Sequence, residues 1–237
     1  MAEQTQIIPQ YARSHEHFGS VSAMVSSDGR VFYIIDEGPI SSVFLPPKWK
    51  LVARDAFSGV LLWQRPISSW ESPLRGFRSG PPEIGRRLIA VKDLVYVTLG
   101  YGEPVTILDA ATGETRKVLS ETAGARELLY RDGKLYVLAD DMTAADHDKR
   151  KKWINETAPT LRGYNFPKKA IPMYGKQRII ALEPETGKSL WTNQYSAAGE
   201  IMPATLAVAG GRVCFQTVSD VVCLDATRGD ELWRTER

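Results

Sequence analysis

The residues that could carry chemistry are few and widely separated in this sequence. Histidines occur as His15-Glu16-His17 and as an isolated His147. A His-x-His pair on a strand directs both imidazoles to one face, as in many metal sites, but no third ligand follows at a suitable spacing. An exposed N-terminal tail or strand is the favoured interpretation. No glycine-rich phosphate loop, Gly-x-Ser-x-Gly motif or zinc-ligand spacing occurs. The sequence therefore predicts no catalytic residue and no metal site.

The two cysteines, Cys214 and Cys223, flank a predicted hairpin and can lie opposite each other on neighbouring strands. Two cysteines are too few for a disulfide framework or a zinc site made of cysteines alone. Buried thiols that pack as small apolar residues are the favoured interpretation, and a disulfide is the alternative. The cysteines therefore leave the compartment open.

Composition excludes several classes of protein. The 237 residues include 43% hydrophobic and 24% charged residues, as in an ordinary globular chain. Lys and Arg number 30 against 28 Asp and Glu, a net charge of +2, which does not favour a nucleic-acid partner. No apolar run approaches the roughly 20 residues that span a bilayer. We therefore expect neither nucleic-acid binding nor a membrane span.

One sequence unit occurs four times, at residues 53–63, 107–117, 181–191 and 223–233. An acidic residue is followed four residues later by glycine, and four after that by tryptophan. The acidic side chain can accept hydrogen bonds from the turn, and the glycine closes it. Each unit is therefore predicted to be a strand, a tight turn and a strand. The turn glycines are Gly59, Gly113, Gly187 and Gly229. The tryptophans are Trp63, Trp191 and Trp233, and Lys117 replaces tryptophan in the second copy.

A second hairpin precedes each unit, and together they predict four-stranded sheets. β-Branched and aromatic runs flank Asp28-Gly29, Lys92-Asp93, Asp132-Gly133 and Gly210-Gly211. Four such sheets in series are typical of β-propeller blades, so the fold class is all-β. The predicted blades cover about 19–66, 86–120, 126–195 and 203–237, after a tail or edge strand at 1–18.

The repeated frame A-x-D-x-x-x-G-x-x-x-W resembles that of the PQQ-repeat (quinoprotein alcohol dehydrogenase-like) propellers. The resemblance covers nearly the whole chain from Ser20. It implies that Trp63, Trp191 and Trp233 dock each blade on the next, and it implies a periplasmic or cell-envelope setting. Family propellers have seven or eight blades. We therefore expect four blades of a larger ring, with pairing of two copies or a four-bladed ring as alternatives.

Insertions distinguish this chain from a plain series of blades. The spacing of the turn glycines is uneven, and the extra residues fall at 36–48, 66–85 and 140–175. The last contains a helix-compatible stretch with the basic run Lys149-Arg150-Lys151-Lys152. Loops of this kind often bind partners, although a solvated excursion that caps its own blade is the alternative. The candidate partner-binding residues are Trp70, Arg78, Trp153, Arg162 and Tyr164.

Two functions remain open at this point. The family resemblance implies a quinoprotein oxidoreductase that holds PQQ with Ca²⁺, but the chain lacks an adjacent cysteine pair and an evident carboxylate cluster. A non-catalytic module that binds a protein or polymer is therefore the favoured hypothesis, with the remaining blades or a second copy as further partners. If a ligand binds at the propeller axis, the candidates are Arg87, Arg126, Glu127 and Glu200.

Overall fold

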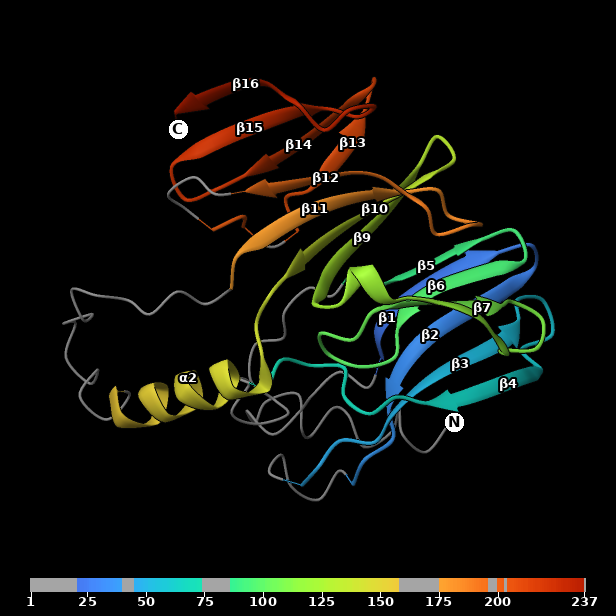
Figure 1. The fold of residues 1–237 in the computed structure, drawn as a ribbon. Coiled ribbons are helices and arrows are strands. Elements are labelled where there is room, and N and C mark those ends of the chain that lie inside the picture. The colour runs from blue at the N-terminus through green and yellow to red at the C-terminus, as the bar shows by residue number, and fades with distance from the viewer. Residues whose placement is uncertain are drawn as a thin grey trace. The chain divides into compact units, whose positions relative to one another are not determined.

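Four four-stranded β-sheets make up the fold, which confirms the predicted all-β architecture of propeller blades (Figure 1). This computed structural model describes residues 21–39, 45–73, 86–157, 175–195, 200–202 and 204–236, without the side chains of 153–157. In every sheet the strands are neighbours in chain order, as in a meander. Among the described residues the helices are the 3₁₀ helix η1 (Ser120–Thr122) and the α-helix α2 (Ala144–Thr157).

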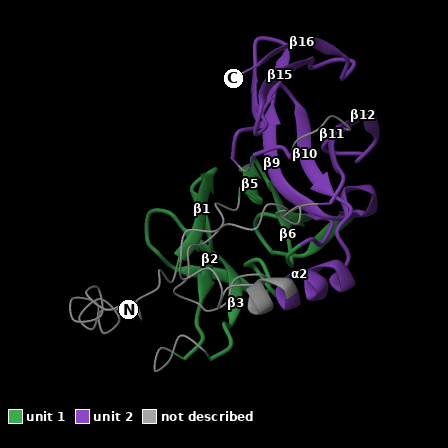
Figure 2. Ribbon diagram, turned by 90° about the vertical axis from the view of Figure 1, so that its left-hand side faces the viewer, with its two compact units in different colours: residues 1–101, 107–117 green, residues 102–106, 118–237 purple. Residues whose placement is uncertain are grey.

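The chain divides into two compact units, residues 1–101 with 107–117 and residues 102–106 with 118–237 (Figure 2). The first sheet contains β1 (Val21–Ser27), β2 (Arg30–Asp36), β3 (Trp49–Asp55) and β4 (Leu61–Pro66). The second contains β5 (Leu88–Val91), β6 (Leu94–Thr98), β7 (Val105–Asp109) and β8 (Thr115–Leu119). The first unit holds the first sheet and most of the second.

The second unit holds the other two sheets. The third sheet contains β9 (Ala125–Arg131), β10 (Lys134–Asp140), β11 (Gln177–Leu182) and β12 (Ser189–Tyr195). The fourth contains β13 (Ala207–Ala209), β14 (Arg212–Gln216), β15 (Asp220–Asp225) and β16 (Glu231–Glu236). No helix in the described part of the chain has the length and apolar character needed to cross a membrane.

Turn chemistry explains why these hairpins form where the sequence predicts them. The β1–β2 turn has positive φ at Asp28 (45°) and Gly29 (71°), the backbone that two-residue hairpins require. In the β7–β8 turn, Asp109 Oδ1 accepts hydrogen bonds from the backbone N–H groups of Ala111 (2.8 Å) and Thr112 (2.9 Å). A hydrogen bond from Arg116, followed by these turn contacts, lowers the pKa of Asp109 to about 2. The aspartate is therefore ionised across the physiological range and holds the turn closed.

Each unit has its own apolar core between its two sheets. In the first unit Phe32, Leu51 and Trp63 pack with Val95 and Leu108. In the second unit a matching cluster forms from residues of both sheets, namely Tyr136, Ile179, Trp191, Phe215 and Leu224. Since both faces of the inner strands are covered, β6 and β10 are buried at nearly consecutive positions. A single sheet could not bury these faces alone, so the pair of sheets is the stable unit.

Candidate functional site

The tryptophan joints are the most regular side-chain contacts in the molecule. In the first unit the Trp63 indole Nε1–H donates to the Ala110 carbonyl oxygen at 3.0 Å. The ring lies directly on Gly113, where an added Cβ would approach Trp63 Cδ2 to 2.6 Å. Arg65, two residues after the tryptophan, donates to the Gly113 carbonyl oxygen at 2.8 Å. This joint therefore links the outer strand of the first sheet to the turn of the second.

The second unit repeats this joint. Trp191 Nε1–H donates to the Ala226 carbonyl oxygen at 3.1 Å, and a Cβ on Gly229 would lie 2.5 Å from the Trp191 ring. Asn193 donates to the Gly229 carbonyl oxygen at 2.8 Å, in the place that Arg65 occupies in the first joint. Trp191 is 8% exposed, and Trp63 is 9% exposed. The joints use backbone acceptors and a glycine, so they depend little on the other side chains.

Arg87, a predicted ligand residue, lies inside the first unit rather than at an open surface. Its guanidinium stacks over the Trp70 ring, 4.2 Å from the centroid, and lies 5.2 Å from the Tyr101 centroid. It also donates to the Trp70 carbonyl oxygen and to Thr98 Oγ1. Arg87 is 3% exposed, so this charge fastens the connection between β4 and β5 to the second sheet.

Trp70, a predicted partner-binding residue, is only 1% exposed. Its ring is covered by the Arg87 guanidinium and belongs to the core of the first unit. The sequence predicted Trp70 as a partner contact in the 66–85 insertion, and the structure places its ring in the core instead. The cation–π contact with Arg87 stabilises the ring inside the fold.

Arg126 and Glu127, the next predicted ligand residues, lie at the start of β9 in the second unit, where Glu127 is buried and Arg126 is partly buried. Arg126 forms a two-pronged ion pair with Asp140 at the end of β10, with Nε–Oδ2 at 2.8 Å and Nη2–Oδ1 at 3.1 Å. Glu127 pairs with Leu138 in the strand register and is 3% exposed. A buried bidentate pair is a geometrically specific contact that costs desolvation on both sides. It marks the point at which the long insertion leaves the sheet.

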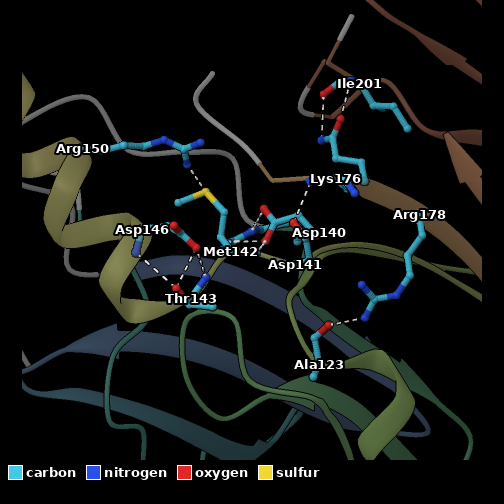
Figure 3. Close-up of polar contacts among 12 residues, drawn as sticks. Ala123, Asp140, Asp141, Met142, Thr143, Asp146, Arg150, Lys176, Arg178 and Ile201 are labelled. Atoms are coloured by element: carbon cyan, nitrogen blue, oxygen red, sulfur yellow. Dashed lines mark hydrogen bonds and ion pairs between the residues drawn. The ribbon is translucent and has the colours of Figure 1, made fainter. Parts of the chain in front are cut away.

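The two ends of that insertion are fastened together (Figure 3). Asp141 Oδ1 accepts a hydrogen bond from the Lys176 backbone N–H at 2.7 Å, and Asp140 Oδ1 accepts one from Met142 N–H at 3.0 Å. The neighbouring Gln177 side chain exchanges two hydrogen bonds with the Ile201 backbone. We call these contacts, with the Arg126–Asp140 pair, the insertion root.

α2 begins directly above the insertion root with a reciprocal cap. Thr143 Oγ1 accepts a hydrogen bond from the Asp146 N–H at 3.2 Å, and Asp146 Oδ2 accepts one from the Thr143 N–H at 3.1 Å. This is the pattern of a capping box. A hydrogen bond from the Thr143 hydroxyl to Asp146 Oδ2 (2.7 Å), followed by the one from the Thr143 N–H, lowers the pKa of Asp146. Arg150 contacts the Met142 sulfur from the second turn of the helix (Figure 3). The helix start is therefore fixed to the sheet.

His147 lies on the inner side of this helix start. Burial lowers the pKa of His147, and the positive charge of Arg126 lowers it further. The imidazole is thus held neutral beside the ion pair. The sequence around His147 did not indicate that it lies near Arg126, because this proximity depends on how α2 packs against the third sheet.

Several predicted residues cannot be assigned a position. Arg78, Arg162 and Tyr164, as well as the 1–18 segment with His15 and His17, lie outside the described residues, and so does the side chain of Trp153. Glu200 is described as partly buried next to the Ile201 bridge to Thr217. The structure therefore brings Arg126 and Glu127 together in one unit and places Arg87 in the other.

The repeats and joints agree with the family comparison. A model of the PQQ_2 family, described as outer membrane protein assembly factor BamB, matches residues 51–237. The chain belongs to the PQQ_2 family. No curated protein matches the chain. The family assignment therefore rests on the repeats, which fill most of the chain.

Solved structures show the same fold as this PQQ_2 chain at low identity. A quinohemoprotein alcohol dehydrogenase from Comamonas testosteroni is 15% identical with a TM-score of 0.57, over 92% of this chain and 35% of that chain. Quinohemoprotein alcohol dehydrogenase ADHIIG from Pseudomonas putida HK5 is 17% identical with a TM-score of 0.52, over 96% and 36%. An uncomplexed Pyrococcus horikoshii acylaminoacyl peptidase is 10% identical with a TM-score of 0.53, over 93% and 33%. This chain thus spans about a third of each of these chains.

The residues described in this PQQ_2 chain do not fit a quinone held with a metal ion. They contain no group of three or more His, Cys, Asp or Glu side chains that could hold a metal. Arg87 and the Arg126–Asp140 pair face protein groups within their own units. A quinone–metal pair needs several oxygen ligands converging on one point. We therefore derive no chemical step through such a cofactor.

Cys214 and Cys223 form a disulfide between β14 and β15. The two residues are direct partners in the strand register, with Cα atoms 4.2 Å apart. The structure thus selects the disulfide over the buried thiols that the sequence favoured. The hairpin geometry is the reason, because directly opposed positions bring two side chains together.

Proposed function

We propose that this chain is a non-catalytic propeller segment that binds a protein partner through the insertion-bearing ends of its blades. Membership of a family described as outer membrane protein assembly factor BamB supports a role in binding other proteins. The single observation that carries the proposal is the insertion root, which fastens both ends of the 140–175 insertion to the third sheet. The ion pair and the capping box at its base fix where α2 starts, so the helix is presented from a defined place on the third sheet.

The topology supports a common location for the insertions within each unit. The β1–β2 and β3–β4 turns are tight and lie at one end of a blade, so the β2–β3 and β4–β5 connections leave the first sheet from the other end. Residues 36–48 and 66–85 therefore start from the same end of the first sheet. In the second unit residues 140–175 leave the third sheet in the equivalent way.

The exposed face of α2 indicates the chemistry of the partner. Lys149, Lys151 and Lys152 are exposed, while Arg150 is buried toward the insertion root. Three exposed ammonium groups on one helix attract an acidic protein surface and steer its approach. We therefore propose an acidic protein surface as the partner of α2.

Charge reversal tests this proposal. The partner is first identified by mass spectrometry, as the protein in envelope extract that amine cross-linkers join to α2 of the wild type. We expect the K149E/K151E variant to lose these cross-links. We also expect it to bind the purified partner at least tenfold more weakly than the wild type at about 0.1 M salt. The control is R131E/K188E, which makes the same change in charge at the turn end of the third sheet. Equal binding by wild type and K149E/K151E would contradict the proposal.

The quinoprotein alternative is favoured by the fold shared with two quinohemoprotein alcohol dehydrogenases. Titration of the purified chain with PQQ and Ca²⁺, followed by the absorbance of the quinone, tests it independently of any partner. We expect no spectral change at micromolar cofactor. Saturable binding with dye reduction by an alcohol would replace the proposal by an oxidoreductase function.

We further propose that the protein works in the cell envelope. The Cys214–Cys223 disulfide supports this setting, because disulfides persist in oxidising compartments. Alkylation of the denatured protein, isolated under acid quench, should modify neither cysteine before reduction and both after it. Two free thiols in the isolated protein would contradict this setting.

A further inference from the structure

The β3–β4 turn of the first sheet carries an apolar patch that the other three repeats replace with small or polar residues. Phe57, Val60 and Leu61 have exposed fractions of 91%, 59% and 44%, and we call these three residues the turn patch. The residues at the same places in the other repeats are Ala111, Glu114 and Thr115, then Glu185, Lys188 and Ser189, and finally Thr227, Asp230 and Glu231. The turn patch is therefore a departure from the chain's own repeat.

The exposure of the turn patch belongs to its place in the blade. The second and fourth sheets each follow another sheet in their own unit, which docks its tryptophan on their turn. Their corresponding residues are nevertheless all exposed, namely Ala111, Glu114 and Thr115 in the second sheet and Thr227, Asp230 and Glu231 in the fourth. A sheet before β1 would therefore leave the turn patch open as well.

The turn presents Phe57 from a fixed backbone. Asp55 Oδ1 accepts hydrogen bonds from the N–H groups of Phe57 (3.1 Å) and Ser58 (2.7 Å). The Phe57 ring lies on Gly29 of the β1–β2 turn, where an added Cβ would be 3.2 Å from Phe57 Cε2. The ring is thus held in place while nearly all of it faces solvent, so little freedom remains to be lost on binding.

The charges beside the turn patch balance each other. Arg54 Nη1 donates to the Gly59 carbonyl oxygen at 2.8 Å. Hydrogen bonds from the N–H and then from the hydroxyl of Ser58 lower the pKa of Asp55, which therefore stays ionised. Residues 56–64 carry no charge. One positive and one negative group thus border an uncharged segment, so its partner is recognised by apolar contact and not by charge.

The size of the turn patch decides between kinds of partner. Three partly or largely exposed apolar side chains offer an area on the order of a few hundred Å². A stable protein interface, including one between two copies of this chain, buries about 800 Å² on each partner. A lipid interface makes no such demand, because binding there scales with the apolar area that enters it and needs no shape complementarity.

We propose that the turn patch inserts into the surface of a lipid bilayer, with the Phe57 ring entering the apolar region. Since the neighbouring charges balance, neutral phosphatidylcholine is sufficient as the lipid and salt has little effect on binding. This inference does not depend on the proposed function of α2, which lies in the other unit and attracts its partner by charge.

Flotation of the purified chain with phosphatidylcholine vesicles tests the inference. A patch smaller than an acyl chain should bind reversibly, with half of the protein bound at on the order of 1 mM lipid. The variant F57A/V60E/L61T carries the residues of the second repeat at these places. We expect it to bind at least about tenfold more weakly than the wild type, because the apolar area that enters the lipid is lost. The wild type should bind equally at about 0.1 M and about 0.5 M salt.

A fluorescent label tests which residue enters the lipid. Both natural cysteines are joined in the disulfide, so a cysteine introduced at position 57 or 111 can be labelled alone. An environment-sensitive dye on F57C should shift its emission to the blue on phosphatidylcholine vesicles. The same dye on A111C, at the equivalent place in the second sheet, should not shift. Equal shifts at the two positions would overturn the inference.

Two control variants separate this contact from other surfaces of the molecule. V218S removes an apolar side chain that is 70% exposed in another hairpin and should float like the wild type. K149E/K151E should also float like the wild type, although it is the variant that tests the proposed function of α2. A wild-type chain that does not float at about 5 mM lipid would overturn the inference. Self-association in sedimentation velocity that F57A/V60E/L61T abolishes would also overturn it, since the turn patch would then bind a second copy.

Discussion

The tryptophan joints and the insertion root both fasten one segment of chain to another, but with different chemistry. At a joint a neutral indole donates to a backbone carbonyl oxygen and covers a glycine. At the insertion root two opposite charges, Arg126 and Asp140, are buried against each other. The joint needs one side chain and a turn that every blade has, so it recurs. The insertion root needs two matched charges brought together by a bulge in the strand register, so among the described residues it occurs in the third sheet alone.

The largest expected change in the free energy of unfolding comes from variants that remove a joint tryptophan. We expect W63A and W191A each to lower the free energy of unfolding by about 3–5 kcal/mol, because a large buried ring leaves a cavity and an unpaired carbonyl. W233A should cost less than about 1 kcal/mol, since its ring is already 44% exposed. Urea denaturation at low micromolar protein measures all three. Equal losses for W191A and W233A would show that the joints do not stabilise the units.

The next largest change in stability is expected from variants that remove the ion pair of the insertion root. D140A leaves the Arg126 guanidinium buried without its main partner and should cost about 3–5 kcal/mol in the second unit. The double variant R126M/D140L removes both charges and should cost clearly less than D140A, because no uncompensated charge remains. The same urea experiment measures both. If R126M/D140L is less stable than D140A, the ion pair itself contributes net stability. The insertion root and the neutral joints would then differ less in how they stabilise the fold than we propose.

A smaller effect probes the glycine side of the joints. G113A brings a methyl group within 2.6 Å of the Trp63 ring and adds strain at a φ of 74°. We expect a loss of about 2–4 kcal/mol from strain and overpacking together. G133A has the strain without the contact and should lose only about 1–2 kcal/mol. The difference in thermal unfolding midpoint between these two variants isolates the contact.

The smallest expected effect is a dependence of stability on pH, which we expect for the insertion root beside His147 and not for the neutral joints. Burial depresses the pKa of His147 in the folded state below its usual value of 6.5, so the unfolded chain takes up the proton first as the pH falls. The resulting stability is present above pH 6.5 and is lost as the pH falls through that value toward the folded pKa. Urea midpoints of the second unit should therefore decrease between pH 7 and pH 5.5, and H147Q should flatten this dependence. A first unit with the same slope would rule out His147 as the cause.

The sequence predicted the repeated parts well because their causes are local. A turn such as Asp28-Gly29 needs only its own backbone, and the A-x-D-x-x-x-G-x-x-x-W frame carries both halves of a joint. These features were sufficient for the four sheets. The exposed Trp233 needed the structure, since the frame does not tell which joints are filled.

The unique parts were predicted poorly because their causes are long-range. Arg87 and Trp70 were assigned to different roles, and the structure stacks one on the other. Arg126 meets Asp140 only because a bulge shifts the β9–β10 register near Ala139. The Asp132-Gly133 hairpin, extended residue by residue, places Arg126 opposite Ala139, so it indicates that Arg126 lies near Asp140 but not that the two charges pair.

The hydrogen bond between Asp141 and Lys176 has a consequence for engineering. Because Asp140 and Gln177 are already paired across the sheet, the chain segment between them starts and finishes at one point. The entropy of closing such a loop rises only slowly with its length. The site should therefore accept grafted peptides of very different sizes, which makes this blade a display scaffold whose cargo can be exchanged without redesigning the fold.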